Sequence, residues 1–450
     1  MMLLLNAFLL FTTTCQGFTI YPVSFAAGPK LLPNYHSFGR NGLQMNVSNS
    51  TTVSETQNEA DYNQDCTSVA GGTQKLDYSE IQNIIDVSRP YYKLENEFQV
   101  DIPATATNGL TSAMPLGFSC TVDPEMSIGR EAGSPISFPE AGRHMAIAGS
   151  VVAALNQPPT KNGKHYYLAM DCHLEAASDV TPIMQTFLTS QIPAGMNDLK
   201  NDQIIISAVC CELTNRKAVC EIMMQFPKEY GGVEPYYLRV NYTVMAPKVF
   251  KRFSPSRALE QQIKRPSSTS NQERKEDNQL VLPQDTLSPY AQFRGLPFDS
   301  FEILSQSNSV VIMKTSVPKV SAASCQGHFD GNPALPIAFL AAFCADLSGK
   351  AIGTLTETCI TFGKECAGPG KKQDTGNILK FISCEVDAHK LVYANTHGLT
   401  LSCEVEKVGC AVRVGEPTIF SSNVLIVASA PPGEKEDLIA KMKFKFELVA

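Results

Sequence analysis

Residues 326–336 carry the residue types that are best suited to chemistry in this chain of 450 residues. The segment reads QGHFDGNPALP, which places His328 among glycine and proline residues and directly before the apolar run of residues 337–347. This run predicts a helix, and the first amides of a helix have no acceptor within it. A histidine beside such amides is suited to chemistry on a carbonyl group, because the amides can bind negative charge on the oxygen.

A second segment of the same outline lies in the N-terminal half. Residues 129–139 are again punctuated by glycine and proline, and they lead into a helix predicted at residues 140–155 that is rich in alanine and glycine. Glycine weakens a helix, so its frequency here indicates close packing against a sheet. Glu140 and His144 lie one turn apart and share a face of this helix, with Arg143 beside them.

These helix residues also have a structural interpretation. Glu140 in the first turn complements the helix dipole, while His144 and Arg143 could be solvated or paired. The C-terminal helix is predicted at residues 336–348, with Gly349 as its C-cap. Asp346 stands so near the end of that helix that a structural role is the simpler interpretation.

The elements around the two helices repeat in the same order. In the N-terminal half, a short helix (residues 77–88) and a strand (96–102) come first, and strands follow the long helix at residues 165–174, 186–192, 203–214, 217–226 and 236–245. In the C-terminal half, a strand or hairpin is predicted at residues 301–317, and later strands at residues 379–395, 399–414, 423–428 and 439–449. The polar residues 254–285 predict a linker, so we predict domains at residues 76–253 and 286–450 that are related by internal duplication.

The string GHFDGNPALP closely resembles the GHFPGNPxxP loop of the hotdog-fold 3-hydroxyacyl-(acyl carrier protein) dehydratases. The resemblance extends upstream to a Leu-Pro opening at residues 296–302 and covers residues 288–350. It implies an α+β fold of two hotdog domains, each a long central helix wrapped by an antiparallel β-sheet. Two fused hotdogs would mimic, within one chain, the dimer that single-hotdog enzymes form.

The resemblance also implies the site residues. In the family, the loop histidine is the base, amides at the helix start hold the thioester oxygen, and a helix carboxylate from the facing hotdog is the acid. His328 matches the family histidine. The substrate-binding positions of the loop are matched by Gly331, Asn332 and Pro336.

The chain departs from the family at two positions that bear directly on the chemistry. Ala342 stands where the family has its carboxylate, and Ile337 replaces the glycine that usually follows the second proline. The N-terminal helix could complete the site, because His328 would face it in a fused pair. We therefore predict three catalytic residues, His328, Glu140 and His144, and place Arg143 nearby for charge or substrate contact.

Three functions fit these residues. The first is dehydration of 3-hydroxyacyl thioesters of acyl carrier protein or coenzyme A, in fatty acid or polyketide metabolism. The second is a hotdog thioesterase, in which a carboxylate activates water. The third is a non-catalytic subunit that binds acyl chains or serves in assembly. Ala342 favours the last two functions, whereas the complete GHFDGNPALP string favours the first.

Charge and cysteine content limit the classes of binding partner and the cellular compartment that we expect for this chain. The formal charge of −7, with 18% charged residues, gives no overall basic field, so we expect no nucleic acid partner. If the partner is an acidic carrier protein, we expect basic residues near the entrance of the substrate tunnel. One basic cluster in the sequence consists of Lys248, Lys251, Arg252 and Arg257. Such a run of basic residues is usually only a solvated loop. The 14 cysteines show no CxxC spacing and lie mostly in apolar runs, which predicts buried thiols in a reducing compartment. No metal site and no cofactor are predicted.

The first residues have the composition of targeting segments. Residues 1–17 contain a short apolar run followed by small residues, as in a signal peptide. Residues 18–54 contain no acidic residue and many hydroxyl side chains, as in a transit peptide. We predict that the transit peptide and the polar segment after it extend to residue 75. This leader resembles that of algae with complex plastids and predicts the plastid stroma, with no membrane span in the mature chain. The alternative is secretion, in which Asn46, Asn49 and Asn241 would be glycan sites.

Overall fold

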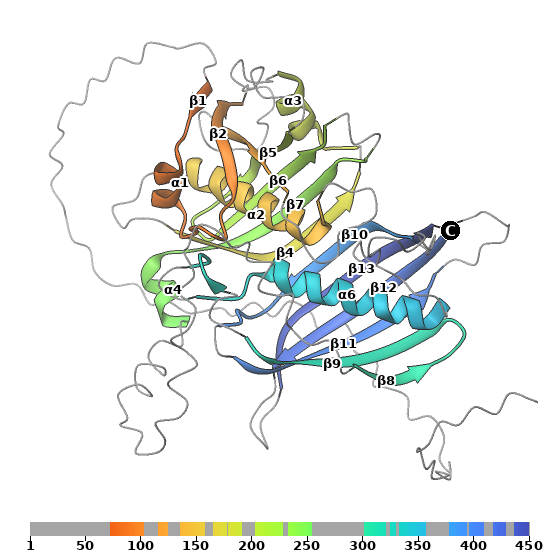
Figure 1. Ribbon diagram of the computed structural model, residues 1–450. Coiled ribbons are helices and arrows are strands. Elements are labelled where there is room, and N and C mark those ends of the chain that lie inside the picture. Colours follow the sequence, from red (N-terminus) through yellow and green to blue (C-terminus); the bar gives the residue numbers. More distant parts are fainter. Residues whose placement is uncertain are drawn as a thin grey trace, which may run out of the picture. The chain divides into compact units, whose positions relative to one another are not determined.

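The computed structural model describes residues 73–102, 116–124, 136–157, 165–177, 179–190, 203–227, 233–253, 301–320, 325–329, 333–356, 378–393, 396–408, 417–428 and 436–449. These residues form an α+β structure in which long helices pack on a large antiparallel sheet (Figure 1). Residues 1–72 and the predicted linker at residues 254–285 lie outside the described residues, so the targeting segments and the linker stay predictions.

The described helices and strands have the following bounds. The helices are α1 (Tyr78–Ile84), α2 (Phe138–Leu155), α3 (Pro182–Ser190), α4 (Pro247–Phe253) and α6 (Ile337–Thr356). The strands of the N-terminal half are β1 (Thr73–Lys75), β2 (Leu94–Asp101), β3 (Leu116–Val122), β4 (Tyr166–Ala176), β5 (Ile204–Leu213), β6 (Lys217–Gln225) and β7 (Tyr236–Met245). Those of the C-terminal half are β8 (Phe301–Gln306), β9 (Val310–Lys319), β10 (Ile378–Ala388), β11 (His397–Lys407), β12 (Thr418–Ala428) and β13 (Asp437–Val449).

The sheet has 13 strands in the order β1-β2-β3-β5-β6-β7-β4-β10-β13-β12-β11-β9-β8. From its middle outward, the N-terminal half runs β4-β7-β6-β5-β3-β2, with β1 as an additional edge strand, and the C-terminal half runs β10-β13-β12-β11-β9-β8. The two halves join where β4 pairs with β10 in antiparallel register, with Cys172 opposite Val386. The strand order therefore occurs twice, which is the arrangement expected of a duplicated unit.

Helix α2 begins and ends where its sequence favours a boundary. The hydroxyl of the N-cap Ser137 accepts a hydrogen bond from the amide of Glu140 (3.4 Å). The side chain of Asn156 closes the other end by bonding the first residue of β3. In between, a Cβ at Gly149 would collide with the hydroxyl of Tyr242. The close packing that the glycines indicate is therefore present.

Helix α6 is longer than the sequence predicts. We expected it to end at Ser348 with Gly349 as its C-cap, but it continues to Thr356 and Gly349 is buried inside it. Ala351 and Ile352 are fully buried, because the helix packs across β9, β11, β12 and β13. This burial outweighs the cost of about 1 kcal/mol for a glycine inside a helix. By length and composition α6 could cross a membrane, but 72% of its apolar window is buried in the protein, as in a core helix.

The strand predicted at residues 186–192 is wrong, because α3 occupies this part of the chain. The prediction rested on a partial alternation of apolar and polar residues. The hydroxyl of Thr181 instead accepts from the amide of Met184 (3.4 Å), and Met184 and Phe187 bury one face of the helix against Val100 and Val209. Strand β3 and helix α4 were not predicted.

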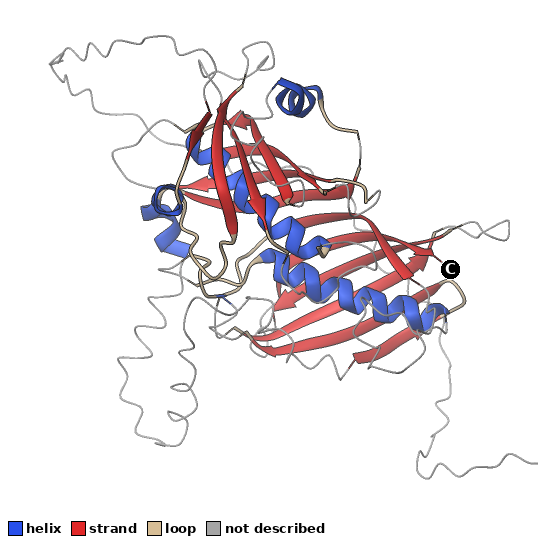
Figure 2. Cartoon of the chain, turned by 45° about the horizontal axis from the view of Figure 1, so that its top comes forward, coloured by secondary structure: helices blue, strands red, loops and turns tan. Residues whose placement is uncertain are grey.

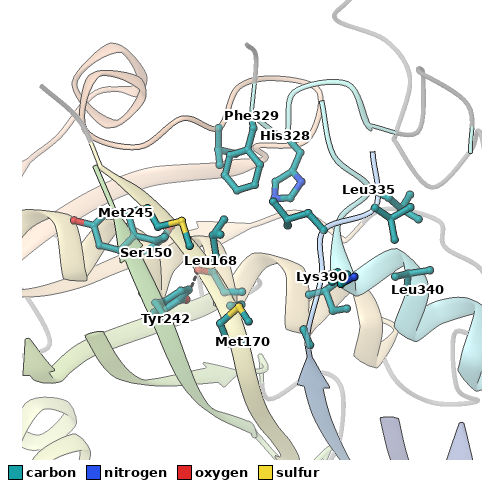
Figure 3. Close-up of a pocket in the computed structure, with 18 of the residues that line it drawn as sticks. Ser150, Leu168, Met170, Tyr242, Met245, His328, Phe329, Leu335, Leu340 and Lys390 are labelled. Atoms are coloured by element: carbon teal, nitrogen blue, oxygen red, sulfur yellow. Dashed lines mark hydrogen bonds between the residues drawn. The ribbon is translucent and has the colours of Figure 1, made fainter. Parts of the chain in front are cut away.

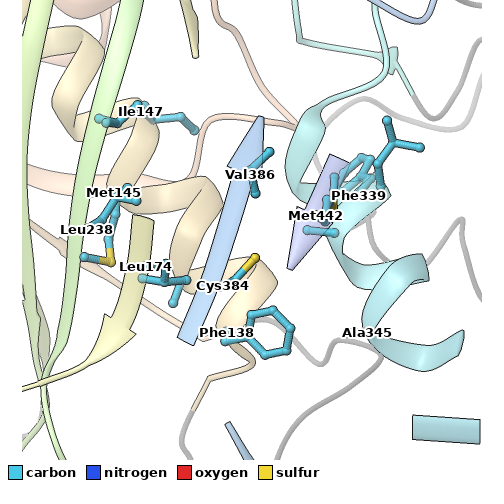
Figure 4. Close-up of a cluster of buried hydrophobic side chains, with 14 of the residues drawn as sticks. Phe138, Met145, Ile147, Leu174, Leu238, Phe339, Ala345, Cys384, Val386 and Met442 are labelled. Atoms are coloured by element: carbon cyan, nitrogen blue, oxygen red, sulfur yellow. The ribbon is translucent and has the colours of Figure 1, made fainter. Parts of the chain in front are cut away.

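One hydrophobic core extends through both halves (Figure 4). The ring of Phe138 at the start of α2 stacks on Phe381 of β10, with 4.1 Å between centroids. Helices α2 and α6 are in contact and lie on the same face of the sheet (Figure 2). Burial of apolar surface therefore holds the two halves together and fixes how each presents its residues to the other.

Candidate functional site

The loop around His328 is held by backbone from the opposite half. The amide of Ser88, between α1 and β2, donates to the carbonyl of Gly327 (2.8 Å). The amide of Phe329 donates to the carbonyl of Asp86 (3.1 Å). Backbone bonds leave little freedom to the residues that make them, so the N-terminal half determines where the histidine of the C-terminal half stands.

The residues on either side of His328 have left-handed backbone. The φ angle is 78° at Gly327 and 62° at Phe329. Phenylalanine rarely adopts this conformation, so its packing must compensate for the strain. The ring of Phe329 stacks on His328 with 4.1 Å between centroids and contacts Phe250 (5.1 Å) and Tyr166 (5.7 Å). These contacts fix the direction of the imidazole.

His328 lies at the wall of a cavity of about 460 Å³ (Figure 3). Both halves contribute to the wall, through α2, β4, β7, α6 and residues 388–393. Most of the wall is apolar, including Ala146, Leu168, Met170 and Leu340. A cavity of this size and polarity suits a hydrocarbon chain, with a few polar groups to orient its reactive end.

The hydrogen bonding of His328 assigns different roles to its two nitrogens. Nδ1 lies 2.8 Å from the carbonyl oxygen of Ala334, which can only accept, so Nδ1 carries the hydrogen. Burial lowers the pKa of His328 to about 4, although the Ala334 carbonyl and the charge of Asp86 act in the opposite direction. The ring is therefore neutral at neutral pH, and Nε2 has no hydrogen-bond partner among the described residues. Such a nitrogen can accept a proton from a molecule in the cavity.

Glu140, Arg143 and His144 form a fully buried polar cluster on α2. Nη2 of Arg143 lies 2.9 Å from Nε2 of His144, and Oε1 of Glu140 lies 3.7 Å from the same nitrogen. Burial lowers the pKa of His144 well below its usual range, and the charge of Arg143 lowers it further. The three residues meet as the sequence places them, but none of them lines the cavity that contains His328.

Tyr91 lies between this cluster and His328. Its ring centroid is 4.8 Å from that of His328, and the guanidinium carbon of Arg143 lies 5.6 Å from the same tyrosine ring. Tyr91 also lines the cavity. Tyr91, which we did not predict, therefore lies between two parts of the predicted composite site.

A sequence signal for Tyr91 exists in the repeat. The pair Pro90-Tyr91 precedes β2 by the same spacing as Pro297-Phe298 precedes β8. Because the Leu-Pro opening at residues 296–302 belongs to the resemblance of the C-terminal half, its counterpart in the N-terminal half was a candidate for the facing wall of the site.

The other predicted positions have simple structural surroundings. Gly331 and Asn332 lie outside the described residues. Pro336 is buried directly before α6, and Ala342 is buried within that helix. Asp346 pairs within α6 with Lys350 (3.3 Å), as a structural role predicts.

The described residues contain no group of three or more His, Cys, Asp or Glu side chains that could hold a metal ion. Their cysteines are free thiols, and most are buried. Burial raises the pKa of Cys344 and of Cys384 well above the usual thiol range, so these thiols behave as small hydrophobes.

Helix α4 brings basic residues close to the His328 loop. Phe250 of this helix is fully buried, stacks on Tyr166 (3.9 Å) and contacts Phe329. The exposed residues of the same helix include the basic side chains Lys248, Lys251 and Arg252. Arg257, the fourth member of the predicted cluster, lies outside the described residues.

The pKa of His328 predicts an unusual pH profile for any reaction in which it is the base. We expect kcat/KM to stay level down to about pH 5 and to fall as Nε2 is protonated near pH 4. An exposed histidine would lose activity near its ordinary pKa of about 6.5. A profile that breaks near pH 6.5 would contradict the assignment.

The control for this measurement is folding. His328 and His144 are both neutral in the folded chain at pH values where an unfolded histidine is charged. The unfolded chain therefore binds more protons below about pH 6.5, and the free energy of unfolding falls as the pH is lowered toward 4. Circular dichroism at each pH separates protonation of the base from this loss of stability.

No family model and no curated protein matches the chain. Among solved structures, the tesB protein of Mycobacterium avium subs paratuberculosis aligns at a TM-score of 0.37 and 8% identity, over 77% of this chain and 98% of that one. The 12:0-ACP thioesterase from Umbellularia californica aligns at a TM-score of 0.35 and 10% identity, over 80% of this chain and 100% of that one. An acyl-ACP thioesterase from Bacteroides thetaiotaomicron aligns at a TM-score of 0.31 and 12% identity, over 71% and 91%. Likenesses at these TM-scores establish neither a family nor an activity for this chain.

Proposed function

We propose that the chain is a pair of hotdog domains that acts on acyl thioesters and dehydrates 3-hydroxyacyl thioesters to enoyl thioesters. The observation that carries the proposal is the position of His328, whose Nε2 is available at the wall of an apolar cavity while Nδ1 is bound to Ala334. The motif resemblance supports the same reaction, because its histidine is the base of the family.

The proposed reaction begins with removal of a proton from C2 of the substrate. The acyl chain would occupy the apolar cavity, with its thioester close to His328. Nε2 takes the C2 proton, and negative charge builds on the thioester oxygen. Ile337, the first residue of α6, lines the cavity, so the start of this helix is the best candidate to stabilise that oxygen.

The neutral imidazole of His328 is also compatible with the alternative of a thioesterase. The same Nε2 could remove a proton from water, which would then attack the thioester carbon. The carboxylate that activates water in hotdog thioesterases has no counterpart among the described residues of the cavity wall, which include no Asp or Glu. Dehydration lacks its family carboxylate as well, at Ala342, so it is the complete GHFDGNPALP loop that favours dehydration. Acyl-chain binding without chemistry is the remaining alternative.

The substrate carrier and the location are part of the proposal. Carrier protein and coenzyme A both bring negative charge, and the basic residues of α4 beside the His328 loop suit either of them. The composition of the N-terminal residues supports the plastid stroma, and import of a fluorescent protein fused to residues 1–75 would test it against secretion.

The test of the reaction follows two products at once. The purified chain is incubated with 3-hydroxyacyl thioesters of several lengths, while enoyl absorbance and free thiol are recorded together. Enoyl product without thiol is the expected result. Thiol without enoyl product would identify a thioesterase, and neither product, with retained acyl-chain binding, would identify a binding subunit.

A further inference from the structure

The proposed dehydration needs a proton donor for the departing hydroxyl group. The position where the family has a carboxylate is Ala342, and no described residue of the cavity wall is Asp or Glu. Glu140 and His144 are buried outside the wall. The donor must therefore come from another residue that lines the cavity or from a carboxylate behind it.

Tyr91 has the position that such a donor requires. It lines the cavity, and its ring lies against the imidazole of His328 at 4.8 Å between centroids. Among the described residues, no group is hydrogen-bonded to its hydroxyl. Two other tyrosines of the wall differ in this respect, because Tyr167 donates to the side chain of Gln157 and Tyr242 donates to the backbone carbonyl of Ala146.

Tyr91 also lies close to a buried cation, the guanidinium group of Arg143. The guanidinium carbon of Arg143 lies 5.6 Å from the tyrosine ring centroid, and Arg143 is itself held by His144 at 2.9 Å. Burial raises the pKa of Tyr91 and the charge of Arg143 lowers it. The phenol is therefore protonated at neutral pH, and the cation is placed to stabilise the tyrosinate that proton donation would leave.

We infer that Tyr91 is the catalytic acid of the proposed dehydration and that Arg143 is a positioning residue which acts through it. This inference rests on the proposed function. Nε2 of His328 takes the proton from C2, the electrons of that C–H bond form the C2–C3 double bond, and the C3–O bond breaks. The hydroxyl leaves as water with the proton of Tyr91. The imidazolium of His328 then returns a proton to the tyrosinate through that water, which restores both residues.

The leaving group of the substrate provides the test. A 3-hydroxyacyl thioester needs an acid, whereas the matching 3-chloroacyl thioester loses chloride without one. We expect Tyr91→Phe to lower kcat about 100-fold or more on the hydroxy substrate, with little change in KM, and to remain close to the wild-type rate on the chloro substrate. His328→Gln should lose both reactions. Tyr92→Phe, which removes a neighbouring hydroxyl that donates to Glu97 and does not line the cavity, is the matched control and should retain both.

Each contrary result has its own meaning. Equal losses of Tyr91→Phe on both substrates would show that the tyrosine only packs on His328, and full activity would exclude it as the acid. If Asp86→Asn, instead of Tyr91→Phe, distinguishes the two leaving groups, the acid is that carboxylate and the inference is overturned. If the unaltered chain converts neither substrate, the proposed function itself fails.

The positioning role of Arg143 is tested by a separate pair of substitutions. Arg143→Lys keeps the cation and Arg143→Met removes it, and circular dichroism shows whether each variant folds. We expect Arg143→Lys to retain more kcat than Arg143→Met on the hydroxy substrate only, with similar KM values. A loss in both variants that is independent of the leaving group would indicate a purely structural role.

Discussion

Replacement of His328 by glutamine should lower kcat/KM for the proposed dehydration by a factor of about 10²–10⁴, the usual contribution of a general base. Glutamine is close in size to histidine, but its amide cannot accept a proton from C2. The carbonyl of Ala334 accepts from Nδ1 at 2.8 Å, and His328→Asn places an amide nitrogen at the position of Nδ1, so it can keep this bond. We expect the same loss in His328→Asn, which removes the base and retains the hydrogen bond that orients the loop.

Substitutions of two other histidines serve as controls for the loss of a histidine side chain that is not the base. His389 also lines the cavity but pairs with Asp387 (3.2 Å), and His173 lies on the surface of β4, where it pairs with Glu175 (3.2 Å). We expect His389→Gln and His173→Gln to retain activity. Substantial activity in His328→Gln, or an equal loss in His389→Gln, would refute the assignment of the base.

His328 was predictable because its signal is local. A histidine among glycines and prolines before an apolar run requires no knowledge of the rest of the chain, and Gly327 indeed has a positive φ angle. The start of α2 was likewise local, since Ser137 and Glu140 form a capping interaction within one turn. Features encoded by neighbours in sequence could be read directly.

The remaining features depend on distant residues. Gly349 is a sound C-cap by local rules, but the strands that pack on α6 extend the helix past it. Met184 and Phe187 become one face of a helix only because β2 and β5 offer them a core. The only sequence signal for Tyr91 is the Pro-aromatic pair that recurs before β8, and Tyr91 reaches the site because the segment between α1 and β2 holds the loop of the opposite half.

A substitution that disturbs the contact between the His328 loop and the segment between α1 and β2 should lower the free energy of unfolding substantially. Gly327→Ala introduces a Cβ that would collide with the carbonyl oxygen of Ser88 and press on the amide of Tyr91, and these backbone atoms cannot swing away as a flexible side chain can. Alanine also disfavours the φ angle of 78° at this position. We expect a loss of about 1–3 kcal/mol in the free energy of unfolding, measured by urea denaturation.

Activity should fall with stability in Gly327→Ala, because the loop can relieve the collision only by moving. Such a movement breaks the 2.8 Å bond from the amide of Ser88 and displaces His328, and a displacement of about 1 Å can lower a rate about 100-fold. Gly142→Ala is the matched control, since its Cβ would meet only a methyl group of Leu174 at 3.5 Å, an ordinary contact. That variant should keep its activity and gain about 0.5–1 kcal/mol from the better helix former. If Gly327→Ala matched Gly142→Ala in stability and rate, the N-terminal half would not hold the loop, and Tyr91 would lose its place beside the base.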